Sequence, residues 1–291
     1  MASIIGLIHP AENSIGGDQL LAYYINANNN LALKIIPLGA PDGLADVYTT
    51  NDVNVKGYVT NPSSLAVMPV KNIMCIYGVI TSSKIGIVSL LSPVLQPLGI
   101  QCETTGASST LPGLTVYQAS VTSVSSTLNE VEVYTAGSDK EIGNATYLAA
   151  YYNVHSAERH IVFQKNDDVI VDYNIDHGDT YVTNAKPGRS PTGLAVVFVP
   201  ELRKAFLYYV RAYTESQVSK YDLWKTETKQ GKTTEWEKPV KVTPAMDILQ
   251  TTQLHVTAWP ERGENYITYF NSAGQAACLH DRWDTVDGSS E

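Results

Sequence analysis

One pattern of about eighteen residues recurs along this chain of 291 residues. Each copy has a leucine, then in most copies Ala, a run of apolar and aromatic residues, a polar turn and a second β-rich run. The clear copies are QLLAYYINANNNLALKII (19–36), SLAVMPVKNIMCIYGV (64–79), YLAAYYNVHSAERHIVFQ (147–164), GLAVVFVPELRKAFLYYV (193–210) and QLHVTAWPERGENYITYF (253–270). A weaker copy is GLTVYQASVTSVSSTLNEVEVYT (113–135). The anchor leucines are Leu20, Leu65, Leu114, Leu148, Leu194 and Leu254, spaced 45, 49, 34, 46 and 60 residues apart.

A period of this length with several short strands is typical of the blades of a β-propeller. One four-stranded sheet cannot bury both of its faces, but it can do so between two neighbouring sheets. The runs are rich in Tyr, Val, Ile and Thr, which favour strands. We therefore predict an all-β fold, a six-bladed β-propeller with four antiparallel strands per blade, as a single domain over 1–291. The alternative is a jelly roll or a β-sandwich.

The two ends of the repeat array suggest how the ring closes. Only 37 residues follow Leu254, which is short for a whole blade. The run SIIGLIH (3–9) precedes the first anchor and has no repeat of its own. We predict that this N-terminal strand closes the last blade as its outer strand. The polar segment 225–245 is predicted to be a long loop or hairpin insertion in blade five, which would explain the 60-residue spacing.

Charge and composition exclude several classes of partner. The net charge is −9 and the acidic residues are scattered, whereas nucleic-acid binding requires a basic stripe. No apolar run reaches the length of a membrane helix, and the N-terminus lacks the pattern of a secretory signal. The three cysteines, Cys75, Cys102 and Cys278, suggest neither a disulfide framework nor a zinc site. We expect a cytoplasmic protein without nucleic-acid or membrane partners; a homodimer is left open.

Motifs of covalent, nucleotide and zinc catalysis are absent from the sequence, so we expect no cofactor and no metal. The stretch DYNIDHGD (172–179) begins like a calcium loop, but His177 and Thr183 stand where such a loop has Gly and Glu. The alternative, which we favour, is a strand that ends in a polar turn. The group His280, Asp281 and Asp284 is likewise read as a polar turn and not as a metal or acid–base site.

The blade pattern resembles the fungal fucose-lectin superfamily of six-bladed propellers. Tyr147–Tyr151 and His160–Gln164 match the first two strands of such a blade, and Val169–Asp172 matches the third. In that family an Arg, a Glu and a Trp hold one sugar at each blade junction. This chain has His160, Asp172 and Tyr181 at the corresponding positions of blade four.

Other blades depart further from the lectin pattern. Blade five offers Phe206 and Lys220, and blades six and two offer Ile267 and Met74 at the Arg position. Apolar residues cannot replace an Arg that binds two hydroxyls. The resemblance thus implies a retained scaffold with lost sugar sites. In length, fold and lost sites the chain also resembles fungal hetero-Diels–Alderases of tropolonic sesquiterpenoid pathways.

Several aromatic residues are candidates for an apolar pocket near the central channel. His255 replaces the Ala that follows the anchor leucine in other blades, and a histidine there could transfer a proton. We assign His255 and Tyr151 as catalytic residues, and Tyr23, Phe198 and Trp259 as substrate-binding residues. For His255 the alternative is a structural histidine bonded to a neighbouring loop, and for the aromatic residues it is packing between blades.

These features predict a biosynthetic enzyme of secondary metabolism with an apolar small-molecule substrate. The resemblance implies a pericyclase, a hetero-Diels–Alderase that dehydrates a benzylic alcohol to a quinone methide and joins it to a terpene alkene without a cofactor. The alternatives are a fucose-type lectin with altered specificity and a non-catalytic scaffold that binds a protein.

Overall fold

The computed structural model describes residues 4–9, 19–25, 31–37, 48–49, 65–70, 73–81, 86–91, 102–103, 147–165, 167–188, 192–215, 218–242 and 248–283. These segments are β-structure joined by turns, apart from one 3₁₀ turn, η2 (Pro260–Arg262). Within them, no helix has the length and apolar character needed to cross a membrane.

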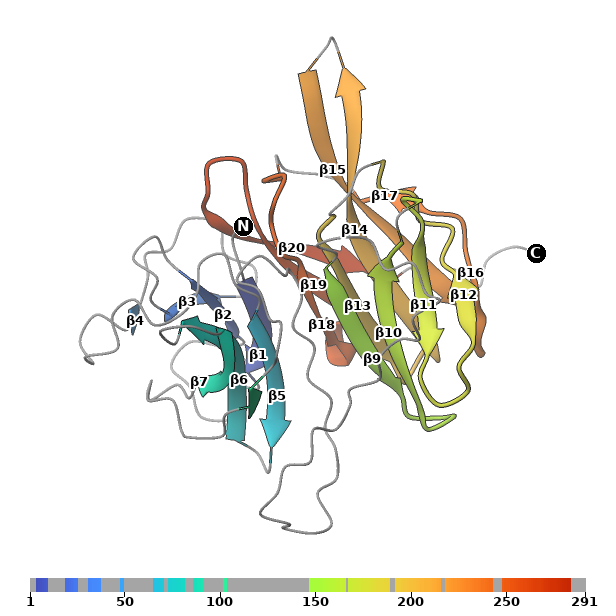
Figure 1. The fold of residues 1–291 in the computed structure, drawn as a ribbon, viewed down its shortest axis with the longest axis horizontal. Helices are drawn as coiled ribbons and strands as arrows, with labels where there is room; N and C mark the ends of the chain where they lie inside the picture. The colour runs from blue at the N-terminus through green and yellow to red at the C-terminus, as the bar shows by residue number, and fades with distance from the viewer. Residues whose placement is uncertain are drawn as a thin grey trace.

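Within the described residues, five antiparallel sheets follow one another along the sequence, and each corresponds to one repeat (Figure 1). Blade one holds β1 (Ile4–His9), β2 (Gln19–Ile25), β3 (Leu31–Pro37) and β4 (Tyr48–Thr49). Blade two holds β5 (Leu65–Val70), β6 (Ile73–Thr81), β7 (Gly86–Leu91) and β8 (Cys102–Glu103). The third repeat, 113–135, lies outside the described residues.

The C-terminal half contains the other three sheets. Blade four holds β9 (Leu148–Asn153), β10 (Glu158–Gln164), β11 (Ile170–Asn174) and β12 (Thr180–Val182). Blade five holds β13 (Leu194–Val199), β14 (Lys204–Glu215), β15 (Val218–Lys229) and β16 (Lys232–Trp236), with β17 (Val240–Lys241) paired to β15. Blade six holds β18 (His255–Trp259), β19 (Glu264–Phe270) and β20 (Ala276–Arg282).

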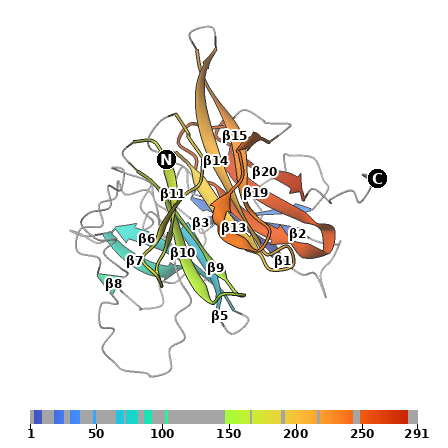
Figure 2. The same ribbon diagram turned by 90° about the vertical axis from the view of Figure 1, so that its right-hand side faces the viewer.

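The blades are arranged with their first strands side by side. Strand β9 lies beside β13, β13 beside β18, β18 beside β1, and β1 beside β5. Blade six is therefore a neighbour of blade one, although the two lie at opposite ends of the chain (Figure 2). This order of neighbouring blades, together with antiparallel sheets of three to five described strands, is the architecture of a propeller. The predicted all-β propeller fold is confirmed for the blades that the structure describes.

The segment just before β18 connects four blades near the starts of their first strands. The Tyr147 hydroxyl of blade four donates a hydrogen bond to the Thr251 carbonyl at 2.9 Å. The Gln253 amide donates to the Leu65 carbonyl of blade two at 3.0 Å and accepts from the Leu65 N–H at 3.4 Å. Gly193 of blade five lies against the carbonyl of Thr252. We call residues 251–253 the hub.

The prediction that the N-terminal strand is the outer strand of the last blade is wrong. Strand β1 pairs with β2, from Ile4 opposite Tyr24 to His9 opposite Gln19, and it is the first strand of blade one. Strands that follow one another in the sequence usually pair, which favours this arrangement. The first and last blades are thus joined by packing of β1 on β18 and β19. As a consequence, β2 is a second strand and Leu20 is not equivalent to the other anchor leucines.

Blade five contains the longest hairpin of the described chain. Strands β14 and β15 have 12 residues each, and their paired ends project from the body in Figure 1. Within the predicted insertion 225–245, the structure places the end of β15, then β16 and β17. Residues 243–247 are not described.

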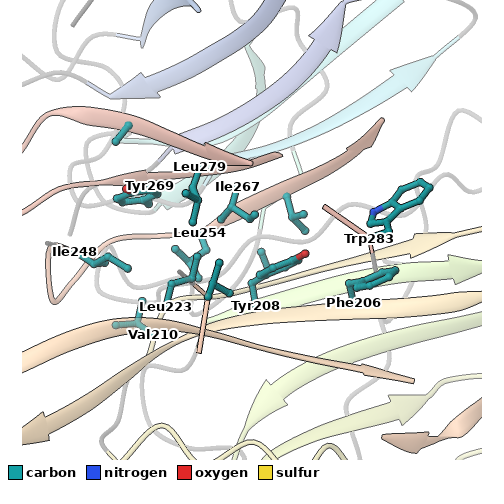
Figure 3. Close-up of a cluster of buried hydrophobic side chains, with 14 of the residues drawn as sticks. Phe206, Tyr208, Val210, Leu223, Ile248, Leu254, Ile267, Tyr269, Leu279 and Trp283 are labelled. Carbon is teal, nitrogen blue, oxygen red and sulfur yellow. The ribbon is translucent and has the colours of Figure 1, made fainter. Parts of the chain in front are cut away.

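The largest described core cluster fills the interface between blades five and six (Figure 3). Strand β14 contributes Phe206, Tyr208 and Val210 on one face, at every second position as a strand requires. Every residue of β19 is buried, because blade packing covers both faces of this central strand. A second cluster, between blades four and five, surrounds the candidate site.

Candidate functional site

A polar group of three buried side chains lies between blades four and five. Tyr151, His160 and Asp172 come from three neighbouring strands, β9, β10 and β11. His160 is paired with Tyr151 on one side, and Asp172 faces Val162, two residues further along β10. Residues two apart on a strand share a face, so the register brings the three side chains together. We call them the Tyr–His–Asp cluster.

The carboxylate of Asp172 connects the other two members. The Tyr151 hydroxyl donates to Asp172 Oδ2 at 2.7 Å, and His160 Nδ1 lies 2.9 Å from Asp172 Oδ1. The side chains of both His160 and Asp172 are 0% exposed. A carboxylate only accepts hydrogen bonds, so an ionised Asp172 fixes the proton of His160 on Nδ1. Both carboxylate oxygens are thereby satisfied within the protein.

Aromatic stacking fixes the planes of the cluster. The Tyr151 ring lies 4.5 Å from the His160 ring, with an interplanar angle of 14°. On the side of blade five, Phe198 of β13 stacks on Tyr151 at 6.2 Å and 9°. His155, in the turn after β9, meets Phe198 edge-on at 6.0 Å. Aromatic rings therefore separate the buried cluster from the turn that follows β9.

Burial dominates the electrostatics of the cluster. It raises the pKa of the Asp172 carboxyl, and the hydrogen bonds and charge of His160 and Tyr151 counteract only part of that rise. Burial and the neighbouring Asp172 carboxylate raise the pKa of Tyr151 well above its usual value. Tyr151 is thus a neutral phenol, while Asp172 takes up a proton more readily than an exposed carboxylate does. Such an arrangement suits proton transfer.

Polar groups of the two adjacent turns form a rim above the cluster. Glu158 Oε2 accepts from the Ser156 hydroxyl at 2.5 Å and lies 3.8 Å from His160 Nε2. Glu158 Oε1 lies 3.1 Å from His177 Nε2. Partial burial acts to raise the pKa of Glu158, but the hydrogen bond from Ser156 and the neighbouring His160 lower it overall. Glu158 is therefore ionised near neutral pH.

The structure brings only two of the predicted site residues together. Tyr151 and Phe198 stack across the interface of blades four and five. Trp259 packs instead with Tyr24 and Tyr266, in the cluster between blades six and one. Tyr23 is buried on β2, on the face opposite Tyr24. The expectation of one shared aromatic pocket is corrected accordingly: these contacts distribute the residues over separate blade interfaces.

His255 is half-buried at the start of β18, opposite Thr268. It shares a strand face with Trp259 and not with Val256, which belongs to the core between blades five and six. This places His255 away from the Tyr–His–Asp cluster. Its predicted catalytic role stays a prediction.

Strand register revises the comparison with the lectin positions. In blade four the anchor Leu148 pairs with Phe163, and His160 lies three residues before that partner. The same offset gives Cys75, Phe206 and Tyr266 in blades two, five and six. Met74 and Ile267 were each one residue off. Lys225, not Lys220, takes the place of Asp172, because it is the residue opposite Tyr208. No arginine stands at the position in any of these blades.

The interpretation of 172–179 as a strand followed by a polar turn is confirmed. The Asn174 side chain accepts from the backbone N–H groups of Asp176 and His177 at 2.9 and 3.1 Å, and Asp176 pairs with Arg159 at 2.6 Å. Among the described residues, no group of three His, Cys, Asp or Glu side chains is placed to hold a metal ion.

The prediction of a polar turn at His280 and Asp281 is wrong, because both residues lie in strand β20, paired with β19. Asp281 belongs to a second polar cluster, between blades five and six. It accepts from the Tyr208 hydroxyl at 2.6 Å and from Lys225 Nζ at 2.9 Å, and the Asn265 amide donates to Tyr208 at 2.9 Å. His280 is largely exposed and faces Glu264 at 3.9 Å. Asp284 lies outside the described residues.

Sequence reasoning missed the contact among the three cluster residues. It placed His160 and Asp172 at lectin positions and assigned Tyr151 as a catalytic residue without a partner. The sequence did carry a signal. His160 and Gln164 lie on one face of a strand, and Asp172 and Asn174 lie on the same face of the next strand. Polar residues at alternate positions among apolar ones indicate a buried polar network, because unpaired polar groups are costly inside a protein.

No protein-family model and no curated protein matches the chain. Solved structures that resemble it include the fucose-specific lectin from Aleuria aurantia, with 11% identity over 96% of this chain and 90% of that chain and a TM-score of 0.49. Another structure of the Aleuria aurantia lectin, described as a six-bladed β-propeller, gives 12% identity, coverage of 96% and 73%, and a TM-score of 0.40. A mutant of AofleA from Arthrobotrys oligospora has 12% identity over 97% of this chain and 69% of that chain, with a TM-score of 0.43. The fold assignment rests on the strand pairing and blade order described above.

Proposed function

We propose that the chain is a cofactor-independent enzyme that dehydrates an aromatic alcohol and directs a hetero-Diels–Alder reaction at the interface of blades four and five. The observation that carries this proposal is the Tyr–His–Asp cluster, in which the Tyr151 hydroxyl donates to a fully buried carboxylate at 2.7 Å. A buried acid–base group beside an aromatic wall fits a flat, weakly polar substrate.

The first step would be loss of water from an ortho-hydroxybenzyl alcohol. The substrate phenol gives its proton to the Tyr151 oxygen while the proton of Tyr151 passes to Asp172. The benzylic C–O bond breaks, and the departing hydroxide takes up a proton from solvent and leaves as water. Asp172 later releases its proton to solvent, which replaces the proton that the departing hydroxide took up. His160 holds Asp172 in place through Nδ1, and its ring stacks on Tyr151.

The second step needs no further proton. The quinone methide reacts with an alkene by forming one C–C bond and one C–O bond. Here the protein would contribute by holding the two reactants together and by excluding water, which is a large effect when the geometry is right. Phe198 and Tyr151, stacked at 6.2 Å, supply a planar apolar surface for the aromatic half of the substrate.

Substitution of Tyr151 tests the proposal. Protein is incubated with an ortho-hydroxybenzyl alcohol and an electron-rich alkene, and the dihydropyran product is measured by mass spectrometry. Tyr151→Phe removes the hydroxyl and keeps the ring, so turnover should fall about 10²- to 10⁴-fold. The control is Tyr152→Phe: Tyr152 is the next residue, is 49% exposed and should be neutral. Equal loss in both variants, or none in either, would rule out the proposed role.

The lectin alternative receives no support from blade four. His160 and Asp172 stand at two of the positions that hold sugar in the lectins that the sequence resembles, but here they bond to each other and are fully buried. Tight binding of a fucoside together with an inactive protein would favour that alternative.

A further inference from the structure

A series of titratable side chains runs from the Tyr–His–Asp cluster to the surface of blade four. Asp172 is followed by His160, then by Glu158 at 3.8 Å from His160 Nε2, and then by His177 at 3.1 Å from Glu158. Exposure of the side chains rises along the series from 0% at His160 to 18% at Glu158 and 59% at His177. Charged or protonatable groups therefore connect the interior with water at one end of the sheet.

We propose that Glu158 and His177 form a proton-exchange route between solvent and the buried cluster. The proposal rests on the proposed function, because dehydration leaves a proton on Asp172 and consumes one at the departing hydroxide. A route that passes a proton outward and another inward restores the resting state after each turnover. Without it, the fully buried Asp172 and His160 exchange protons with water only when the blade interface opens.

The positions of the side chains favour this route over others. His160 carries two ring nitrogens, and Nδ1 is held by Asp172, so Nε2 faces Glu158. The remaining 3.8 Å between His160 Nε2 and Glu158 Oε2 exceeds a hydrogen bond, and one water or a small rotation of the carboxylate would span it. The Ser156 hydroxyl holds the same carboxylate oxygen in this position.

Other neighbours are less suited to the transfer. His155 lies near the same end, but its Nε2 is 2.9 Å from the Pro200 carbonyl and its ring packs on Phe198. The remaining ionisable or polar groups that influence Tyr151, Asp172 or Glu158 are the phenol of Tyr181 on β12, the indole of Trp236 on β16 and the amide of Asn174 on β11. Indole and amide groups neither ionise nor act as bases near neutral pH, so they do not relay protons. Tyr181 bonds to Asp179 at 3.3 Å instead.

Nuclear magnetic resonance of the histidine rings tests the route without any substrate. The rate at which the buried ring N–H of His160 exchanges with water is measured in ¹⁵N-histidine-labelled protein by saturation transfer. In Glu158→Gln, which keeps shape but cannot carry a proton, exchange should slow at least about tenfold near neutral pH. His177→Gln changes an exposed residue, so folding is retained, and it should give a smaller slowing in the same direction. The matched control is Glu201→Gln, an exposed residue between β13 and β14, for which the rate should be unchanged.

The outcomes separate this proposal from the proposed function. Unchanged exchange in both Glu158→Gln and His177→Gln would overturn the route, even if the enzyme activity is real. Slowed exchange without any turnover by the parent protein would keep the route and refute the proposed reaction. If Glu158→Gln fails to fold by circular dichroism, His177→Gln decides the matter, since parental exchange in that variant contradicts the proposal.

Discussion

We expect Gln253→Met to destabilise the protein, because Gln253 links blade six to blade two. Its amide donates to the Leu65 carbonyl at 3.0 Å and accepts from the Leu65 N–H at 3.4 Å. Leu65 is the first residue of β5 and is buried. The amide of Gln253 therefore forms hydrogen bonds with the N–H and the carbonyl of Leu65 at the edge of β5, as the backbone of a neighbouring strand would.

The magnitude follows from the two backbone groups that lose their partner. Met matches Gln in length but offers no hydrogen bond. Each buried polar group left unsatisfied costs about 1–3 kcal/mol, so after relaxation the loss should be roughly 2–4 kcal/mol. For a chain of this size that corresponds to a lower Tm by about 5–10 °C.

Urea denaturation followed by circular dichroism measures this effect. The matched control is Gln275→Met, in the exposed turn between β19 and β20, which should change the free energy of unfolding by less than about 0.5 kcal/mol. Equal midpoints for the two variants would show that the contact between Gln253 and Leu65 does not hold the blades together.

Four further outcomes are expected. Gly193→Ala would place a Cβ 2.3 Å from the Thr252 carbonyl, so it should cost about 2–4 kcal/mol in urea denaturation, more than Gly274→Ala, where the Cβ meets open space but the positive φ adds about 1 kcal/mol. Burial raises the pKa of Asp172 in the folded state, so the native state gains a proton more readily than the unfolded chain. The stability of the parent relative to Asp172→Asn should therefore rise as the pH falls from 7 toward about 4, and parallel pH profiles in denaturant titrations would contradict this. His255→Ala should fold normally, as shown by circular dichroism, and keep parental turnover, because His255 lies on blade six, away from the Tyr–His–Asp cluster; slower turnover would restore its predicted catalytic role. Methyl fucoside should bind no tighter than millimolar in titration calorimetry, and a micromolar signal would restore the lectin interpretation.

The repeat made the blades predictable from the sequence, but it did not determine which strand begins a blade. Leu65, Leu148 and Leu194 each stand at the start of a first strand, as predicted. Leu20 belongs to a second strand, because the preceding run at 4–9 pairs with β2 and takes the inner position. Periodicity alone cannot distinguish these cases, since both strands of a hairpin carry the same alternation of apolar residues.

Register explains the remaining errors at the site. A shift by one residue turns a side chain to the other face of the sheet, so Met74 and Ile267 were matched to the wrong face. In blade five the error is larger, because β14 and β15 extend far beyond the body of the sheet and move their turn outward. The residue that faces Tyr208 is consequently Lys225, which lies five positions beyond the residue suggested by counting from the sequence.

The stacking of Tyr151 on Phe198 also depends on register, in a way that the sequence obscured. Both residues come from first strands and looked equivalent. The pairing shows that Val197, not Phe198, matches Tyr151, since Val197 lies opposite Phe206 as Tyr151 lies opposite His160. Phe198 therefore points to the opposite face of its own blade, toward blade four, and meets Tyr151 across the interface. Tyr151 and Phe198 therefore do not occupy equivalent positions in two blades; they contact each other between the blades.

Blades four, five and six can be compared at all three positions of the Tyr–His–Asp cluster, and only blade four contains the cluster. The equivalents of Tyr151, His160 and Asp172 are Val197, Phe206 and Lys225 in blade five, and Thr257, Tyr266 and Cys278 in blade six. Neither set contains a carboxylate between a phenol and an imidazole, so neither can reproduce the proton transfer proposed for blade four. A lectin gains from repeating its site around the ring, because several weak sites bind a surface together. A catalyst needs only one site with all of its groups in place, so the difference between blade four and these two blades supports the proposed function.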